Sequence, residues 1–268
     1  FSGGTAGVRD NVLMLATNAA KTIYIDIWNY WHFALVGALI FSTSGNVIMG
    51  LVATGLLAIY TIKLSDWTAP EVERETGREG IAISPLSSVG LLPYGVGVNW
   101  LLDRIPGVRN IDYNPHKRGD KHSVFGEPMV IGFLIGVVLG VAAGYGAKNL
   151  LETAVLIAAV MFLLPKSGGL IGDGMEPVSH TLRSVIQRRF PKKKNLNIAL
   201  DAAVILDHRS ILTAGLILMP ISLIIALILP GNKMLPLGGL PALISQISVI
   251  TLISRGNVFR AVIAGIPL

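Results

Sequence analysis

The chain has 268 residues, of which 52% are hydrophobic and only 14% are charged. Ordinary soluble domains carry about 25% charged residues, so this composition indicates an integral membrane protein and argues against a soluble enzyme. The formal net charge is +6, and the absence of cysteine excludes disulfides, thiolate nucleophiles and cysteine-ligated metals within these residues. Because the basic residues cluster in short segments between apolar stretches, cytoplasmic retention of those segments explains them without a nucleic-acid partner.

Five stretches of at least 20 residues carry no charge, which is the length that a helix needs to cross a bilayer. The 30 glycines and 14 prolines interrupt many of them. Such interruptions favour close helix packing and broken or re-entrant segments over smooth spanning helices. The sequence therefore predicts an all-α polytopic membrane protein. The uncharged stretches are residues 33–62, 80–102, 128–147, 210–232 and 234–254.

The first stretch, 33–62, follows an aromatic tract typical of a membrane interface and is longer than one perpendicular span. Gly45, Asn46 and Gly50 mark the positions where it is expected to tilt or break. The next stretch, 80–102, is a poor helix because proline and glycine recur through it. We expect a re-entrant hairpin there, with an ordinary kinked span as the alternative.

Two basic segments, 103–127 and 183–194, flank two candidate spans at 128–147 and 150–171. If both spans cross, the two basic segments return to one side, as the positive-inside rule requires of cytoplasmic loops. In the last third, proline and glycine break the beginning of 234–254, which is also expected to start as a re-entrant hairpin.

A weak internal similarity between two segments of the sequence indicates a repeat. Asp26 and His32 precede one long apolar stretch, and Asp201 and His208 precede another at nearly the same spacing. Many transporters consist of two such halves around a site near the bilayer midplane. We therefore expect an inverted-repeat transporter with re-entrant hairpins. Residues 1–268 are interpreted as a single membrane transport domain, truncated at both ends and belonging to a longer chain.

Ionisable side chains beside apolar stretches are the main candidates for a binding site, because a charge at the bilayer centre costs about 2.5–3.5 kcal/mol. A water interface explains Asp26 at least as well as a polar cavity does. His32 favours function because an uncharged stretch follows it directly, whereas charged neighbours on both sides can hold His208 at the surface.

Amides suit a polyhydroxylated ligand because they both donate and accept hydrogen bonds, which makes Asn29 a candidate. Asn232 follows Pro-Gly and suits a turn equally well, and Glu127 precedes a proline and suits a helix start equally well. The candidate substrate-binding residues are Asp26, Asn29, His32, Glu127, Asp201, His208 and Asn232.

A metal site is a weaker interpretation. His116, Asp120 and His122 lie close together, but among lysine and arginine, so a solvated loop is preferred. No metal, cofactor or catalytic residue is assigned.

The tract 25–33 (IDIWNYWHF) resembles the galactitol-specific membrane subunit, enzyme IIC, of the bacterial sugar phosphotransferase system, in the ascorbate–galactitol superfamily. Further matches follow in order along the chain, which makes them specific as a set. They are KLSDW (63–67), EGIAI (79–83), RIPGV (104–108), FGEP (125–128), Asp173-Gly174, Leu200-Asp201 with His208, PGN (230–232) and GNVFR (256–260).

The resemblance implies a multi-pass permease of the bacterial inner membrane that binds a hexitol, with galactitol expected, and presents it inwards. There a separate IIB subunit, phosphorylated on a cysteine and supplied indirectly by IIA, phosphorylates the substrate. The chain itself then contributes to phosphotransfer only together with IIB. His32, His208 or Glu127 is expected to act as the base for the attacking hydroxyl. We also expect a homodimer in contact with membrane lipid.

Two other classes stay open. In an ion-coupled secondary transporter of a small polar solute, Asp26 and Asp201 carry protons or sodium ions. A non-transporting membrane scaffold binds no small polar solute at all.

Overall fold

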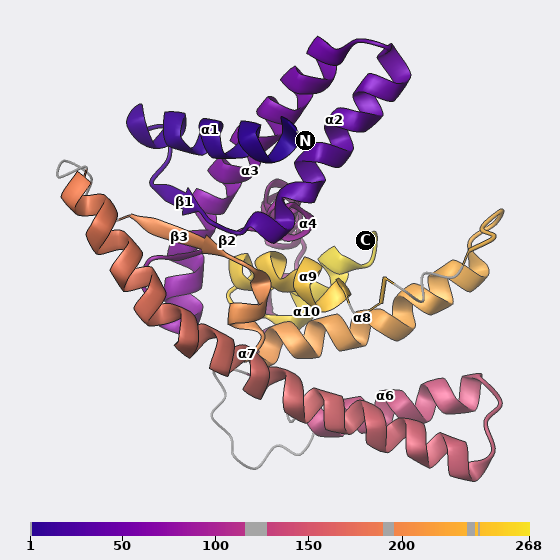
Figure 1. The fold of residues 1–268 in the computed structure, drawn as a ribbon. Helices are drawn as coiled ribbons and strands as arrows, with labels where there is room; N and C mark the ends of the chain where they lie inside the picture. The colour runs from indigo at the N-terminus through magenta and orange to yellow at the C-terminus, as the bar shows by residue number, and fades with distance from the viewer. Residues whose placement is uncertain (1, 116–127, 190–195, 235–238, 241) are drawn as a thin grey trace. The chain divides into compact units, whose positions relative to one another are not determined.

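The computed structural model describes residues 2–115, 128–189, 196–234, 239–240 and 242–268 (Figure 1). The chain is mostly helical, which confirms the predicted helical membrane character, and it divides into two compact units. The first unit comprises Phe1–Gly90 and Asp173–Ala202, and the second comprises Leu91–Gly172 and Ala203–Leu268.

The first unit combines helices with a small sheet. Its elements are α1 (Ser2–Ala16), β1 (Thr22–Tyr24), the 3-10 helix η1 (Ile27–Tyr30), α2 (Trp31–Ser44), α3 (Val47–Thr76), β2 (Ile81–Ile83), the short α4 (Leu86–Val89) and β3 (Asn197–Leu200). The second unit is helical. Its elements are α5 (Leu92–Leu102), the 3-10 helix η2 (Val108–Asn110), α6 (Pro128–Ala142), α8 (Arg209–Ile228), α9 (Ala242–Ile253) and α10 (Val258–Gly265). Two elements, α7 (Ala147–Arg189) and η4 (Ala202–Ile205), contribute residues to both units.

The uncharged stretch 33–62 breaks at Gly45 and Asn46, two of the three predicted positions, whereas the third, Gly50, lies inside α3. Gly45 ends α2 with a left-handed φ of 67°, and the Asn46 side chain accepts hydrogen bonds from the first backbone amides of α3. The two helices then run side by side as a hairpin (Figure 1). A Cβ added to Gly50 would lie 2.8 Å from the carbonyl oxygen of Gly37, so their close approach requires glycine.

The stretch 80–102 forms β2, α4 and α5 in succession, and a continuous spanning helix is absent from it. Pro85 precedes α4, and Pro93 occupies the first turn of α5, where a missing N–H is tolerated. The re-entrant arrangement of this stretch stays a prediction.

The three strands form one parallel sheet in the order β1-β3-β2. Almost every strand residue is buried, as parallel sheets require. These strands cannot be predicted from the sequence, because apolar runs of three or four residues are too short to distinguish strand from helix.

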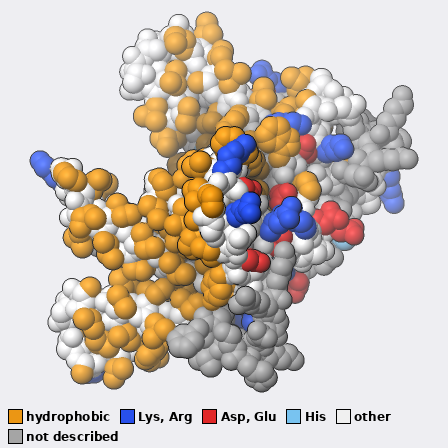
Figure 2. Space-filling view, turned by 180° about the vertical axis from the view of Figure 1, so that it is seen from behind, with side chains coloured by type: hydrophobic (Ala, Val, Ile, Leu, Met, Phe, Trp, Pro, Cys, Tyr) orange, Lys and Arg blue, Asp and Glu red, His pale blue; other side chains and the backbone are white. Residues whose placement is uncertain are grey.

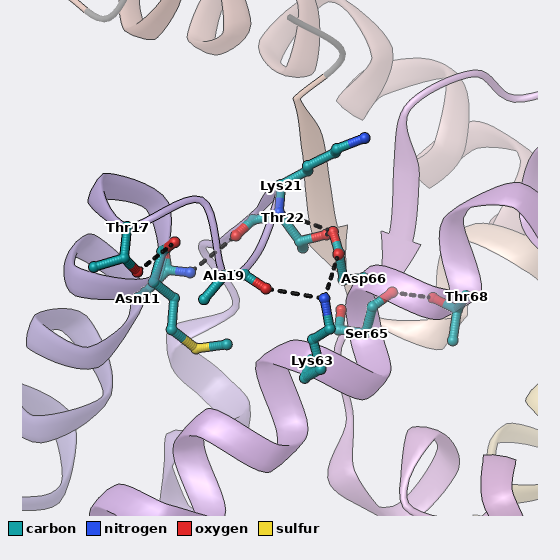
Figure 3. A network of polar contacts seen from close by, with 10 residues as sticks. Asn11, Thr17, Ala19, Lys21, Thr22, Lys63, Ser65, Asp66 and Thr68 are labelled. Atoms are coloured by element: carbon teal, nitrogen blue, oxygen red, sulfur yellow. Dashed lines mark hydrogen bonds and ion pairs between the residues drawn. The ribbon is translucent and has the colours of Figure 1, made fainter. Parts of the chain in front are cut away.

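Side chains from α1 and α3 complete the outer edge of β1 (Figure 3). The Asn11 amide donates to the Thr22 carbonyl at 2.9 Å. It also accepts from the Tyr24 amide at 3.1 Å, as a neighbouring strand would. Asp66 accepts from the Lys21 amide at 3.0 Å and from the Thr22 hydroxyl at 2.8 Å. The free edge is therefore satisfied without another strand.

The outer edge of β2 is satisfied by two hydroxyls on α3. Ser65 donates to the Ile83 carbonyl at 2.6 Å, and Thr68 accepts from the Ile83 amide at 2.8 Å. Both edges of the sheet are thus closed by buried side chains, so the strand ends are held in place.

Three of the described helices, α3, α7 and α8, are long and apolar enough to cross a membrane. The apolar helices α6 and α9 have 15 and 12 residues, which is too short to cross about 30 Å of hydrocarbon. Large hydrophobic side chains lie on the surface, including Leu56, Leu156 and Leu227, which are 63%, 66% and 71% exposed. Figure 2 shows hydrophobic side chains spread over much of one face. Such exposure fits a lipid environment.

Candidate functional site

The three strands of the first unit point their carboxyl ends to the same edge of the sheet. A polar residue follows each strand: Asp26 follows β1, Ser84 follows β2 and Asp201 follows β3. The strands pair in register, with Tyr24 opposite Ala199 and Ile83 opposite Leu200. Side chains distant in sequence are therefore brought together, at the position where ligands bind in many parallel sheets.

These residues and Asn29 form a hydrogen-bonded group that we call the strand-end cluster. The Asn29 amide nitrogen donates to Asp26 Oδ2 at 2.5 Å and to Asp201 Oδ2 at 3.1 Å. Ser84 Oγ also donates to Asp26 Oδ2. One amide group thus holds two carboxylates near each other.

Burial differs across the strand-end cluster. Ser84 and Asn29 are buried, Asp26 is half-buried and Asp201 is exposed. The cluster therefore has a buried part, formed by Ser84 and Asn29, and an accessible carboxylate, that of Asp201. Hydrogen-bond acceptors arranged in this way suit a neutral ligand with several hydroxyl groups.

His32 lies beside the cluster at the start of α2. Its Nδ1 is 3.0 Å from the Asn29 carbonyl oxygen, and the Trp31 ring stacks on the imidazole with centroids 3.8 Å apart. Since a carbonyl oxygen only accepts, Nδ1 carries the hydrogen in this contact. In the neutral ring Nε2 is then the acceptor, so His32 is oriented to take a proton through Nε2.

Three aromatic residues, Tyr24, Tyr30 and Phe33, pack together next to the strand-end cluster. The Tyr24 hydroxyl donates to the Ser84 carbonyl at 2.7 Å, and the Tyr30 hydroxyl donates to the Tyr24 carbonyl at 3.2 Å. Phe33 packs against both rings. Burial raises the pKa of the Tyr24 phenol, and the neighbouring Asp26 raises it further. The phenol therefore stays protonated and keeps donating at any physiological pH.

The structure brings together four of the sequence-predicted site residues, namely Asp26, Asn29, His32 and Asp201. His208 and Asn232 belong to the second unit. The Asn232 amide donates to two backbone carbonyls at 2.8 Å, which matches the turn interpretation. Glu127 lies outside the described residues.

Sequence reasoning missed Ser84. The signal was its position directly after a buried apolar triplet, but this signal has meaning only once the triplet is recognised as a strand. The candidate metal residues His116, Asp120 and His122 lie outside the part of the chain that the structure describes. Within the described ranges, no group of three His, Asp or Glu side chains is placed to hold a metal ion.

The fold and the strand-end cluster together define a helical membrane protein with a polar site inside one of its units. Comparison with known families is specific: the model of the EIIC-GAT family, the PTS system sugar-specific permease component, matches residues 6–268. The chain therefore belongs to this family, and the resemblance found in the sequence is confirmed.

Curated relatives agree. The PTS system galactitol-specific EIIC components of Escherichia coli strains K12 and O157:H7 are each 36% identical over 256 residues, covering 96% of this chain. A putative permease IIC component of strain K12 is also 36% identical over 96% of the chain. The chain spans 56–58% of the length of these relatives. No solved structure matches it.

Proposed function

We propose that the chain is the greater part of a multi-pass hexitol permease subunit of the bacterial inner membrane, and that galactitol is its substrate. The names of the two galactitol-specific relatives support this choice. The observation that carries the proposal is the strand-end cluster, in which Asn29 holds Asp26 and Asp201 side by side.

The chemistry of a hexitol fits this arrangement. Each of its hydroxyl groups donates and accepts hydrogen bonds, and ionised carboxylates are strong acceptors for such donors. Since both Asp26 and Asp201 bond the same nitrogen, one polyol can reach both. The exposed Asp201 carboxylate makes the first contact, and the half-buried Asp26 takes a hydroxyl further in.

Phosphorylation then makes uptake one-way. The substrate hydroxyl attacks the phosphorus carried by the cysteine of a separate IIB subunit, the P–S bond breaks, and the thiolate leaves. His32 accepts the hydroxyl proton on Nε2, which its contact with Asn29 leaves as the acceptor. The IIA subunit then transfers a new phosphate group to IIB. We also propose that the permease is a homodimer. The phosphate dianion on the product cannot recross the hydrocarbon.

An ion-coupled secondary transporter is the rival class, with Asp26 and Asp201 as the cation ligands. The described geometry does not favour it, because the Asn29 amide places N–H donors against both carboxylates. A bound cation would have to displace those donors, since cations take only acceptor ligands.

Uptake of labelled galactitol by sealed vesicles containing the full-length protein tests the proposal. We expect uptake to require phosphoenolpyruvate and the soluble phosphocarrier, and to fall at least tenfold in Asp201→Asn and Asp26→Asn. The matched control is Asp173→Asn, whose carboxylate is 75% exposed and lies 3.9 Å from the Arg78 guanidinium. Uptake that follows a pH or sodium gradient without phosphoenolpyruvate would establish the rival class.

A further inference from the structure

The second unit contains a polar cavity of about 570 Å³, separate from the strand-end cluster of the first unit. It lies among the end of α5, η2 and the turn that joins α9 to α10. Its volume is in the usual range for small-molecule sites. The charged and amide side chains that line it include Arg109, Arg255, Arg260, Asp103, Asp112 and Asn99.

The turn that carries Arg255 is held rigidly. Asn114 is buried, accepts from the Ser210 hydroxyl at 3.1 Å and donates to the Arg255 carbonyl at 2.7 Å. Arg255 itself has a φ of 56°, a left-handed conformation that residues other than glycine rarely adopt. The next residue, Gly256, has a φ of 72°, and a Cβ there would lie 2.6 Å from Asn114. The structure thus holds Arg255 in an unusual but well-defined place.

Arg260 also lines the cavity and is held there by two contacts. Its guanidinium pairs with Asp103 at 2.7 Å and donates to the Arg109 carbonyl at 3.2 Å, and its side chain is only 13% exposed. Asn257 caps α10 and donates to the Ile111 carbonyl at 2.8 Å. Arg260 therefore neutralises Asp103 and positions the backbone of Arg109.

The remaining charges in the cavity favour an anion. Arg109 and Arg255 are exposed, and no carboxylate within the described ranges forms an ion pair with either of them. Against these two guanidiniums stands one further lining carboxylate, Asp112. Two guanidinium groups on a rigid frame match the oxygens of a phosphate group, whereas a carboxylate and the amide of Asn99 match hydroxyl groups.

We propose that this cavity binds the phosphate ester of a polyol, with Arg109 and Arg255 on the phosphate and Asp112 and Asn99 on hydroxyls. The choice of a polyol rests on the proposed function, because the phosphorylated hexitol is the product of that reaction. Arg109 belongs to the basic segment 103–127 that the positive-inside rule assigns to the cytoplasmic side, where the product is released. The site is a product-binding site, distinct from the site for the unphosphorylated hexitol.

Titration calorimetry on the detergent-purified, full-length protein tests this site with a hexitol phosphate, the free hexitol and inorganic phosphate as probes. Using Asp201→Asn as the background removes binding of the ester at the strand-end cluster. In that background we expect the ester to bind, inorganic phosphate to compete with it, and the Arg109→Gln/Arg255→Gln pair to weaken the ester at least tenfold. Arg104→Gln is the matched control, because Arg104 stacks on Trp100 with its guanidinium carbon 3.4 Å from the ring centroid and does not line the cavity.

The outcomes separate the two proposals. Equal affinity of the ester for the double variant and its background overturns the product site, even if the free hexitol binds wild-type protein normally. Ester binding that depends on Arg109 and Arg255, together with no hexitol binding in wild type, leaves the product site standing and removes the proposed function. Repeating the titration in nanodiscs identifies the source of the phosphate. Binding in neutral lipid supports a soluble ester, whereas occupancy by phosphatidic acid alone overturns it in favour of a lipid headgroup.

Discussion

Replacing Asn29 with leucine removes the one amide that bridges the carboxylates of the strand-end cluster. Asn29 is 5% exposed, and its nitrogen makes two hydrogen bonds to carboxylates, at 2.5 Å to Asp26 and 3.1 Å to Asp201. A hydrogen bond to a charged group contributes about 1.5–3 kcal/mol. The bond to Asp201 belongs near the lower end because that carboxylate is exposed to solvent. We therefore expect Asn29→Leu to lose about 3–4.5 kcal/mol of interaction free energy in all.

Two measurements divide this loss between stability and binding. Each kcal/mol corresponds to about 2–4 °C of melting temperature for 150–250 residues and to less in a longer chain, so the detergent-solubilised, full-length variant should melt lower by up to about 18 °C. Its affinity for galactitol, measured by calorimetry, should fall at least tenfold, because the two carboxylates no longer have a common partner and separate.

Asn232→Leu is the control, since Asn232 is exposed and the described hydrogen bonds of its side chain go to backbone groups of Ala226 and Met234. An Asn29→Leu protein that melts and binds galactitol like the wild type would refute the claim that this amide organises the site. So would an equal loss in Asn232→Leu.

Three further predictions concern the sheet edge, the helix hairpin and the proton acceptor. Asn11→Leu leaves a carbonyl and an amide of β1 without partners, so the melting temperature should fall by the equivalent of about 2–5 kcal/mol. Gly50→Ala places a methyl group against the carbonyl of Gly37 and should destabilise the α2–α3 hairpin by about 1–3 kcal/mol. The control Gly169→Ala meets open space inside α7 and should melt no lower than the wild type, because alanine is the better helix former. His32→Gln should retain galactitol affinity but lower the rate of phosphotransfer by about 10²–10⁴-fold, and an unchanged single-turnover rate would exclude His32 as the base.

The membrane character and the helix break could be predicted because their causes are local. Long uncharged stretches indicate a lipid environment on their own, independently of their tertiary contacts. At Gly45 and Asn46 the left-handed residue and the capping side chain are adjacent in sequence, so the end of α2 and the start of α3 follow from two residues. Neither inference needs knowledge of a distant partner.

The sheet could not be predicted, because its cause is distant. β1 and β3 contain three and four residues and pair across more than 170 positions, and nothing in either triplet or quartet specifies its partner. The internal similarity did single out Asp26 and Asp201, and the structure explains why: each follows a strand and precedes a 3-10 helix. The same similarity included His208, which follows η4 and belongs to the other unit, so the spacing alone does not identify the site.

The pattern of strand, polar residue and short helix occurs three times among the residues that the structure describes, at Asp26, Ser84 and Asp201. Each instance interrupts the succession of helices with extended backbone, whose hydrogen-bonding groups lipid cannot satisfy. The sheet, with its edges closed by Asn11, Ser65 and Thr68, satisfies those groups inside the protein.

A membrane scaffold has no need of such an arrangement, because continuous helices satisfy their own backbone. In a transporter the interruptions have a purpose, since they bring polar side chains together at the ends of broken elements, where a substrate can be bound away from lipid. We infer that the three interruptions position the residues of the strand-end cluster, so that the same breaks in the helices create both the sheet and the site.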